Sequence, residues 1–253
     1  MTDAIENIAP DLCPPDRDAA LVLNDGSVFW GRGAGAKTST TGELCFNTSL
    51  TGYQEILTDP SYAGQIIIFT FPHIGNVGTN LEDVESGIPA VRGCVMSASI
   101  SEPSNWRSAK HLDDWLKYHN LAAITEVDTR ELTRRIRKTG FINGTIITGQ
   151  INILAAIKQT KSFSGLEGLD LAKDVTCSEI YTWDESVWSL KTGYSRQINP
   201  QFNVVAMDFG AKKNILRCLA AAGCKVTVVP ATTTADNILA LNPDGIFLSN
   251  GPG

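Results

Sequence analysis

The sequence predicts an α/β protein in which a mixed β/α domain is followed by the start of a doubly wound parallel sheet. Two observations predict this class. Short strand-like runs alternate with helical patterns over residues 19–177. From Asn203 onward, three apolar runs alternate with two helical patterns over short connections, the β-α-β-α-β order of a parallel sheet. We therefore expect a loose tail, a first domain, a linker and an incomplete second domain, over residues 1–18, 19–177, 178–202 and 203–253.

The first domain is predicted to open with a β-hairpin. Asp25-Gly26, which tolerates positive φ, lies between the apolar runs Ala20–Leu23 and Val28–Trp30. Further strands are expected at Leu44–Asn47, Gln65–Phe71, Cys94–Ala98 and Gly144–Thr148. Helices are expected at Ala109–His119 and at Thr129–Lys138, the second with Asp128 or Thr129 as its cap.

The second half changes character twice. Residues 178–202 mix Tyr181, Trp183, Trp188 and Tyr194 with polar residues, which predicts an ordered linker packed on a domain surface. The continuous apolar run Val204–Met207 is typical of a strand covered on both faces. The elements expected after it are a helix at Lys212–Ala222, a strand at Lys225–Val229, a helix at Ala235–Leu241 and a strand at Gly245–Ser249.

Composition and charge exclude several classes of protein. The chain of 253 residues is 43% hydrophobic with a formal net charge of −6, so it has no general attraction to nucleic acid or to anionic membranes. The first residues show neither a basic region nor a long apolar run, so we expect no signal peptide and a cytoplasmic protein with free thiols. The histidines His73, His111 and His119 lack metal-ligand spacing, so no metal site is expected.

Several segments, taken in order, resemble one known family. They are Phe46–Glu55, Thr58–Tyr62, Pro72–Gly78, Asp128–Arg130, Leu132–Arg134, Asp208–Lys212 and Phe247–Gly253. The same segments occur in the same order in the small subunit of carbamoyl-phosphate synthetase, and the similarity runs from about Ala20 to the last residue. No single segment is specific, but the ordered set is.

The resemblance implies both a fold and an activity. Members of the family join an N-terminal β/α domain to a class I glutamine amidotransferase domain. Their complete small subunit hydrolyses glutamine, and the ammonia passes to a large subunit that forms carbamoyl phosphate for arginine and pyrimidine synthesis. The implied partners are therefore the large subunit and L-glutamine. ATP and Mg²⁺ are used by the large subunit, and no cofactor is expected in this one.

The resemblance also assigns site residues. Ser61 matches a family position that contacts glutamine, and Gly251 and Gly253 match glycines that line the glutamine pocket, where a backbone N–H faces the developing oxyanion. The family's nucleophilic cysteine, histidine and glutamate belong to segments beyond Gly253, so no catalytic residue is expected within this sequence. On the residues alone, Ser61 would be a turn or cap residue, and Gly251-Pro252-Gly253 a plain turn.

Other motifs have simpler explanations. Cys218 lies in an apolar helical pattern and is expected in the core, whereas Cys224 opens a strand at the far end of the sheet from the pocket. Gly31–Gly35 is interpreted as a turn, because no clear helix follows it. The arginines of 130–137 are interpreted as a solvated helix face.

Two functions remain open at this point. The chain is either part of a glutaminase subunit or a non-catalytic scaffold that binds the large subunit. A stand-alone nucleotide-binding module is disfavoured, because only one glycine follows the strand Val204–Met207, at Asp208-Phe209-Gly210.

Overall fold

The computed structural model describes residues 13–252, so most of the expected tail over 1–18 and the predicted site residue Gly253 lie outside the described residues. The chain has a mixed α/β architecture and divides into two compact units. We call them the barrel unit and the sheet unit. The barrel unit holds the described part of Met1–Leu57 with Gly64–Asp83 and Val91–Gly168. The sheet unit holds Thr58–Ala63, Val84–Ala90 and the described part of Leu169–Gly253.

The barrel unit is a closed barrel in the order β1-β2-β6-β5-β4-β3-β7. Its strands are β1 (Ala19–Leu23), β2 (Val28–Gly35), β3 (Ser39–Asn47), β4 (Gln65–Phe69), β5 (Gly93–Val95), β6 (Ala122–Thr125) and β7 (Asn143–Thr148). Strands β3, β4, β5 and β6 pair in parallel, and the remaining pairs are antiparallel. Fully buried aliphatic side chains such as Leu21, Ile66 and Ile146 fill the core.

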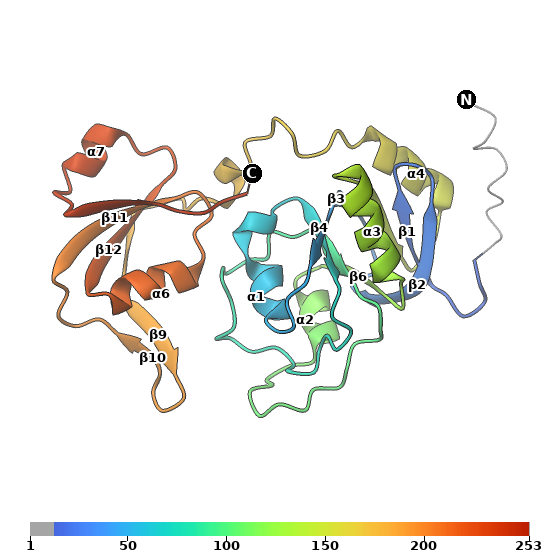
Figure 1. Ribbon diagram of the computed structural model, residues 1–253, viewed down its shortest axis with the longest axis horizontal. Coiled ribbons are helices and arrows are strands. Elements are labelled where there is room, and N and C mark those ends of the chain that lie inside the picture. The colour runs from blue at the N-terminus through green and yellow to red at the C-terminus, as the bar shows by residue number, and fades with distance from the viewer. Residues whose placement is uncertain (1–12, 253) are drawn as a thin grey trace. The chain divides into compact units, whose positions relative to one another are not determined.

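Helices pack on the barrel through their apolar faces (Figure 1). Its helices are α1 (Tyr53–Thr58), α2 (Leu112–Tyr118), α3 (Thr129–Thr139) and α4 (Ile153–Ser162). In α3, Asp128 caps the start by accepting a hydrogen bond from the Glu131 amide at 2.9 Å. Leu132 and Ile136, four residues apart, turn the same face of α3 onto the barrel core.

The hydrophobic pattern predicted most of these elements. The hairpin at Asp25-Gly26 is confirmed, with Gly26 at φ 88° and β1 paired to β2. The interpretation of Gly31–Gly35 as a turn was wrong, because these residues belong to β2. A Cβ on Gly31 would lie 2.3 Å from the carbonyl oxygen of Thr125, so the glycine lets β2 and β6 approach closely.

The sheet unit is built on the order β13-β11-β12-β8. Strands β11 (Phe202–Asp208), β12 (Cys224–Pro230) and β13 (Gly245–Leu248) are parallel, and β8 (Tyr181–Trp183) is antiparallel to β12. Helix α6 (Lys213–Ala221) packs through Leu216 on the face that includes Ala206. Helix α7 (Ala235–Leu239) packs through Ile238 against Val205. The side chain of Val205 lies on the opposite face of the sheet from that of its neighbour Ala206. A short helix, α5 (Ala172–Val175), precedes β8.

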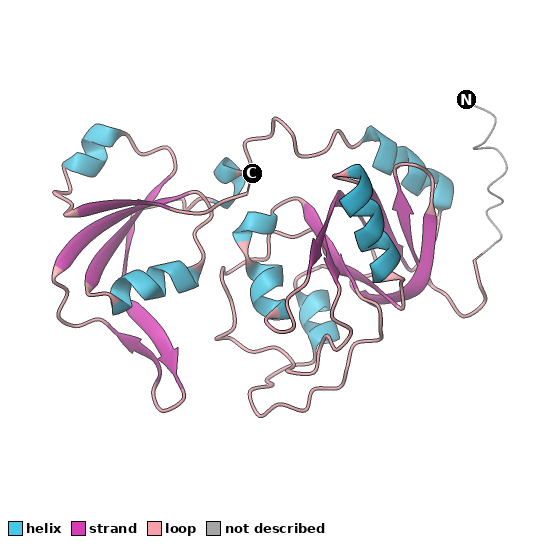
Figure 2. Cartoon of the chain, in the orientation of Figure 1, coloured by secondary structure: helices cyan, strands magenta, loops and turns pink. Residues whose placement is uncertain are grey.

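Residues 178–202, expected as a linker, form β8, β9 (Glu185–Ser189) and β10 (Gly193–Arg196), the last two as an antiparallel hairpin (Figure 2). A buried arginine of α6 anchors this hairpin. The Arg217 Nε atom lies 2.8 Å from Glu185 Oε1, and its guanidinium stacks 3.8 Å from the centre of the Tyr194 ring. The aromatic residues of this segment thus belong to the fold of the sheet unit.

The expectation that Cys218 lies in the core was wrong, since its side chain is exposed. The buried face of α6 is formed by Leu216, Arg217 and Ala220. Arg217 can lie on this face because its apolar stem packs there while its guanidinium pairs with Glu185, and Cys218 lies off that face.

The described residues also contain no helix that is both long and apolar enough to cross a membrane.

Replacing Arg217 by alanine should destabilise the sheet unit. The variant leaves Glu185, whose side chain is 35% exposed, without its partner and removes the stacking on Tyr194, so we expect a loss of about 2 kcal/mol of unfolding free energy. Arg196→Ala breaks the exposed pair with Asp184 and should cost less than about 1 kcal/mol. Pulse proteolysis across a urea gradient measures both, and equal losses would contradict the anchoring role of Arg217.

Candidate functional site

Two loops meet at the carboxyl ends of neighbouring parallel strands in the sheet unit. Strand β11 pairs with β13 from Val204↔Gly245 to Met207↔Leu248, so both strands end at the same edge. Residues 209–212 follow β11 and residues 249–252 follow β13. Open parallel sheets bind their ligands beyond this edge, because strand ends and loop amides converge there.

A buried carboxylate shapes the loop after β11. Asp208, which is 6% exposed, accepts hydrogen bonds at Oδ1 from the amides of Gly210 at 2.9 Å and Ala211 at 2.7 Å. Its Oδ2 accepts a third from the Cys177 amide at 2.7 Å. Gly210 has φ 109°, a conformation that residues with a Cβ rarely adopt. Together these contacts fix the course of residues 208–211.

Asn250 joins the two loops to a third segment. Its side-chain Nδ2 donates to Ser61 Oγ at 2.7 Å and to the carbonyl oxygen of Gly210 at 3.0 Å. Its Oδ1 accepts from the Lys212 amide at 3.3 Å. One side-chain amide therefore connects the loop after β13, the loop after β11 and the segment that carries Ser61.

The segment around Ser61 has its own support within the sheet unit. Asp59 accepts a hydrogen bond from the Ser61 amide at 2.9 Å and starts a single 3-10 turn, Pro60–Tyr62. Lys212 Nζ lies 3.1 Å from Asp59 Oδ2, and the Asp59 side chain is only 9% exposed. The Ser61 hydroxyl accepts from Asn250, and residues 13–252 show no acceptor for its own proton.

Gly251 occupies a position where a side chain cannot fit. A Cβ at this residue would lie 2.1 Å from the carbonyl oxygen of Phe209. The two loops are further held by the Phe209 amide, which donates to Ser249 Oγ at 2.9 Å. The structure thus explains the glycine by close packing of two loops, and it places Ser61 in contact with the residue that precedes Gly251. Glutamine binding by Ser61, Gly251 and Gly253 stays a prediction.

The sequence analysis singled out neither Asn250 nor Asp208 as site residues, although both lie in segments that it quoted. The signal available in the sequence was the Asp-x-Gly pattern at Asp208, which is typical of a side chain capping a turn. Nothing in the sequence alone indicates that the Asn250 amide reaches Ser61, because the two residues are far apart along the chain.

The thiol of Cys177, whose amide donates to Asp208, is unsuited to act as a nucleophile. Burial, reinforced by the negative charge of Asp208, raises the pKa of Cys177 to about 11. The group therefore remains a neutral thiol at physiological pH, and the thiolate is the reactive form. Cys224 starts β12, at the opposite end of the sheet from the two loops, as the sequence predicted. Within residues 13–252 no cluster of three or more His, Cys, Asp or Glu side chains could hold a metal ion.

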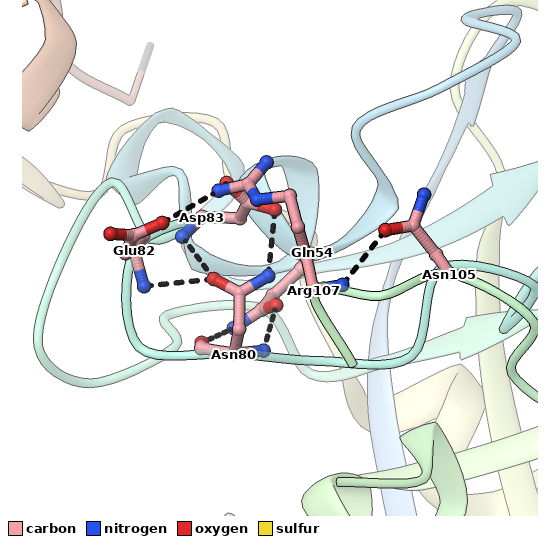
Figure 3. Close-up of polar contacts among 6 residues, drawn as sticks. All are labelled: Gln54, Asn80, Glu82, Asp83, Asn105 and Arg107. Carbon is pink, nitrogen blue, oxygen red and sulfur yellow. Dashed lines mark hydrogen bonds and ion pairs between the residues drawn. The ribbon is translucent and has the colours of Figure 1, made fainter. Parts of the chain in front are cut away.

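A cavity in the barrel unit is a second candidate site, but two of its charged lining residues, Asp83 and Arg107, are already paired with each other. This cavity of about 220 Å³ is lined by residues of 51–55 together with Gly78, Asp83 and Arg107. Arg107 Nη2 donates to Asp83 at 2.6 Å and to Glu82 at 3.0 Å, as Figure 3 shows. These contacts make the cavity the surface of an internal polar network, and it is a weaker candidate than the loops around Asn250.

Comparison with known proteins matches both units. Residues 21–146 match the family model of the carbamoyl-phosphate synthase small chain, CPSase domain, and residues 205–253 match that of class-I glutamine amidotransferases. A solved aminopeptidase from Aneurinibacillus sp. strain AM-1 aligns with 91% of this chain and 56% of its own at a TM-score of 0.33 and 10% identity, a likeness too weak to support a conclusion.

Three similar relatives are carbamoyl phosphate synthase small chains. Identity is 56% to the protein of Ruegeria pomeroyi, and 52% to those of Bradyrhizobium diazoefficiens and Brucella anthropi. The alignments cover 93%, 93% and 100% of this chain, which spans 61%, 61% and 64% of the length of these relatives. The two family models match in the order expected for this family. More than half of the aligned residues are identical to these relatives over nearly the whole sequence. The chain therefore belongs to the carbamoyl-phosphate synthase small chain family.

Proposed function

We propose that this chain provides the glutamine-recognition part of a glutaminase subunit. The subunit would hydrolyse glutamine and supply ammonia to a large synthetase chain, which would make carbamoyl phosphate for arginine and pyrimidine synthesis. One observation carries the proposal most strongly: Asn250 Nδ2 donates to Ser61 Oγ at 2.7 Å, at the strand ends where amidotransferase-type sheets place their ligand. The match of residues 205–253 to glutamine amidotransferases supports the same substrate.

The roles that we assign follow from the chemistry of amide hydrolysis. The reaction needs a nucleophile, a neighbouring base and donors for the developing oxyanion. Backbone N–H groups of Gly251 and Gly253 would face that oxygen, and the free proton of Ser61 would bind a polar group of the substrate. The 253 residues contain no Gly-x-Cys-x-Gly sequence that could supply a cysteine on a sharp turn. No catalytic nucleophile is therefore assigned within them.

The proposal extends to partners and location. The subunit would act as a heterodimer with the large chain in the cytoplasm. It would need no cofactor of its own, since ATP and Mg²⁺ would be used by the large chain. The acidic net charge of −6 supports the absence of nucleic-acid and membrane partners.

We expect the 253-residue polypeptide not to hydrolyse glutamine by itself. Extending it with the remaining residues of the Ruegeria pomeroyi small chain should give glutaminase activity. In that extended chain, Ser61→Ala should raise the KM for glutamine by about 3- to 10-fold, the effect of one lost hydrogen bond. Ser195→Ala, at an exposed serine of β10, is the matched control. Turnover by the unextended chain, or equal KM values for both variants, would contradict the assignment.

Association with the large chain is a separate prediction. The barrel is closed and its core is buried, so the unextended chain should fold and keep its docking surface. We expect it to co-purify with the large chain of a close relative at moderate salt. Co-purification without activity after extension would favour the non-catalytic scaffold. Complete separation of two folded chains would contradict the partnership.

A further inference from the structure

We propose that Glu85 is a positioning residue of the glutamine site, because it caps helix α6 and thereby fixes the loop that Asn250 holds. The inference deepens the proposed function and rests on it. Glu85 lies in the segment Val84–Ala90, which belongs to the sheet unit although barrel residues flank it in the sequence.

Helix α6 receives its cap from this distant segment. Its own N-cap residue, Lys212, makes no capping hydrogen bond with its side chain within the described part of the chain. Glu85 supplies two acceptors in its place. The carbonyl oxygen of Glu85 accepts from the Lys213 amide at 3.1 Å, and its carboxylate Oε2 accepts from the Asn214 amide at 2.9 Å. A carboxylate here also interacts favourably with the positive end of the helix dipole.

The capped turn is continuous with the candidate site. Three successive amides, those of Lys212, Lys213 and Asn214, donate to Asn250 Oδ1, to the Glu85 carbonyl and to the Glu85 carboxylate. The first of these bonds is the longest, at 3.3 Å, and it depends on the course of the turn that Glu85 fixes. Loss of the cap would let this turn fray, and Asn250 would lose one of the groups that orient its amide toward Ser61.

Glu85 is itself held in place. Its amide donates to Thr58 Oγ1 at 2.9 Å, and the hydroxyl of the next residue, Ser86, donates to the Thr58 carbonyl at 2.7 Å. Thr58 is 2% exposed and directly precedes Asp59, which starts the turn of Ser61. The segments that carry Glu85 and Ser61 are therefore bonded to each other next to the site.

The loop that leads into Glu85 is also fixed at its start, in the barrel unit. The buried side chain of Gln54 donates to the Asn80 carbonyl at 2.6 Å and accepts from the Asn80 amide at 3.0 Å. Asn80 in turn donates to Asp83 at 2.8 Å, and Arg107 donates to the same carboxylate (Figure 3). These contacts restrict the freedom of residues 80–83 within the barrel unit.

Hydrogen exchange of the 253-residue chain tests the cap directly. Glu85→Ala should speed exchange at Lys213 and Asn214 by about 2- to 30-fold, the range expected for a lost helix cap. Glu85→Gln keeps a side-chain oxygen and should restore part of the protection. Glu179→Ala removes an exposed carboxylate of the same unit and should leave these amides unchanged. Unchanged exchange in Glu85→Ala overturns the proposal.

Glutamine kinetics of the extended chain test the positioning role. Glu85→Ala should raise the KM for glutamine by about 2- to 10-fold with a smaller change in kcat, and Glu85→Gln should recover most of the loss. Faster exchange with an unaltered KM makes Glu85 a structural cap only and overturns the positioning role. Inactivity of the unsubstituted extended chain would count against the proposed function alone, since the exchange experiment still decides whether Glu85 caps α6.

Discussion

The side-chain amide of Asn250 is the contact on which the candidate site depends. Its oxygen and nitrogen bond the loop after β13 to two other segments: the loop after β11, through Lys212 and Gly210, and the segment that carries Ser61. Each segment is also fixed separately: Asp208 shapes the loop after β11, and Asp59 starts the turn of Ser61. These separate contacts fix the conformation of each segment, whereas Asn250 fixes the segments relative to one another. A side chain without both a donor and an acceptor could not make these contacts.

Backbone packing limits what this site can tolerate. Gly210 adopts φ 109°, and a Cβ on Gly251 would collide with the carbonyl of Phe209, so the two loops approach more closely than residues with side chains allow. The amides of residues 209–212 all donate to side-chain oxygens of Asp208, Ser249 and Asn250, so these bonds and the close packing together fix the loop after β11.

The sequence predicted those elements that local patterning determines. Strands β1, β2, β11 and β12, and the capped helix α3, follow from apolar periodicity and turn residues. Strand β6 and helix α4 were missed, because a run of four residues and a weakly patterned helix give little local signal. Cys218 was wrongly expected in the core, and the burial of Arg217 was not expected, since its pairing with Glu185 is a tertiary contact. Ser61 and Gly251 were assigned through resemblance, and their role in glutamine binding stays a prediction. Asn250 and Glu85 act through long-range bonds that no local pattern encodes, whereas Asp208 had a local signal in its Asp-x-Gly pattern.

A double-mutant cycle between Ser61 and Asn250 tests the central claim most directly. The measured quantity is the free energy of opening of β11, obtained from native-state hydrogen exchange in Ser61→Ala, Asn250→Ala and the double variant. A direct hydrogen bond of 2.7 Å predicts a coupling energy of about 0.5–1.5 kcal/mol, so the two single effects should sum to more than the double effect. Simple additivity within about 0.3 kcal/mol would contradict the account, because Ser61 and Asn250 would then stabilise the sheet unit independently.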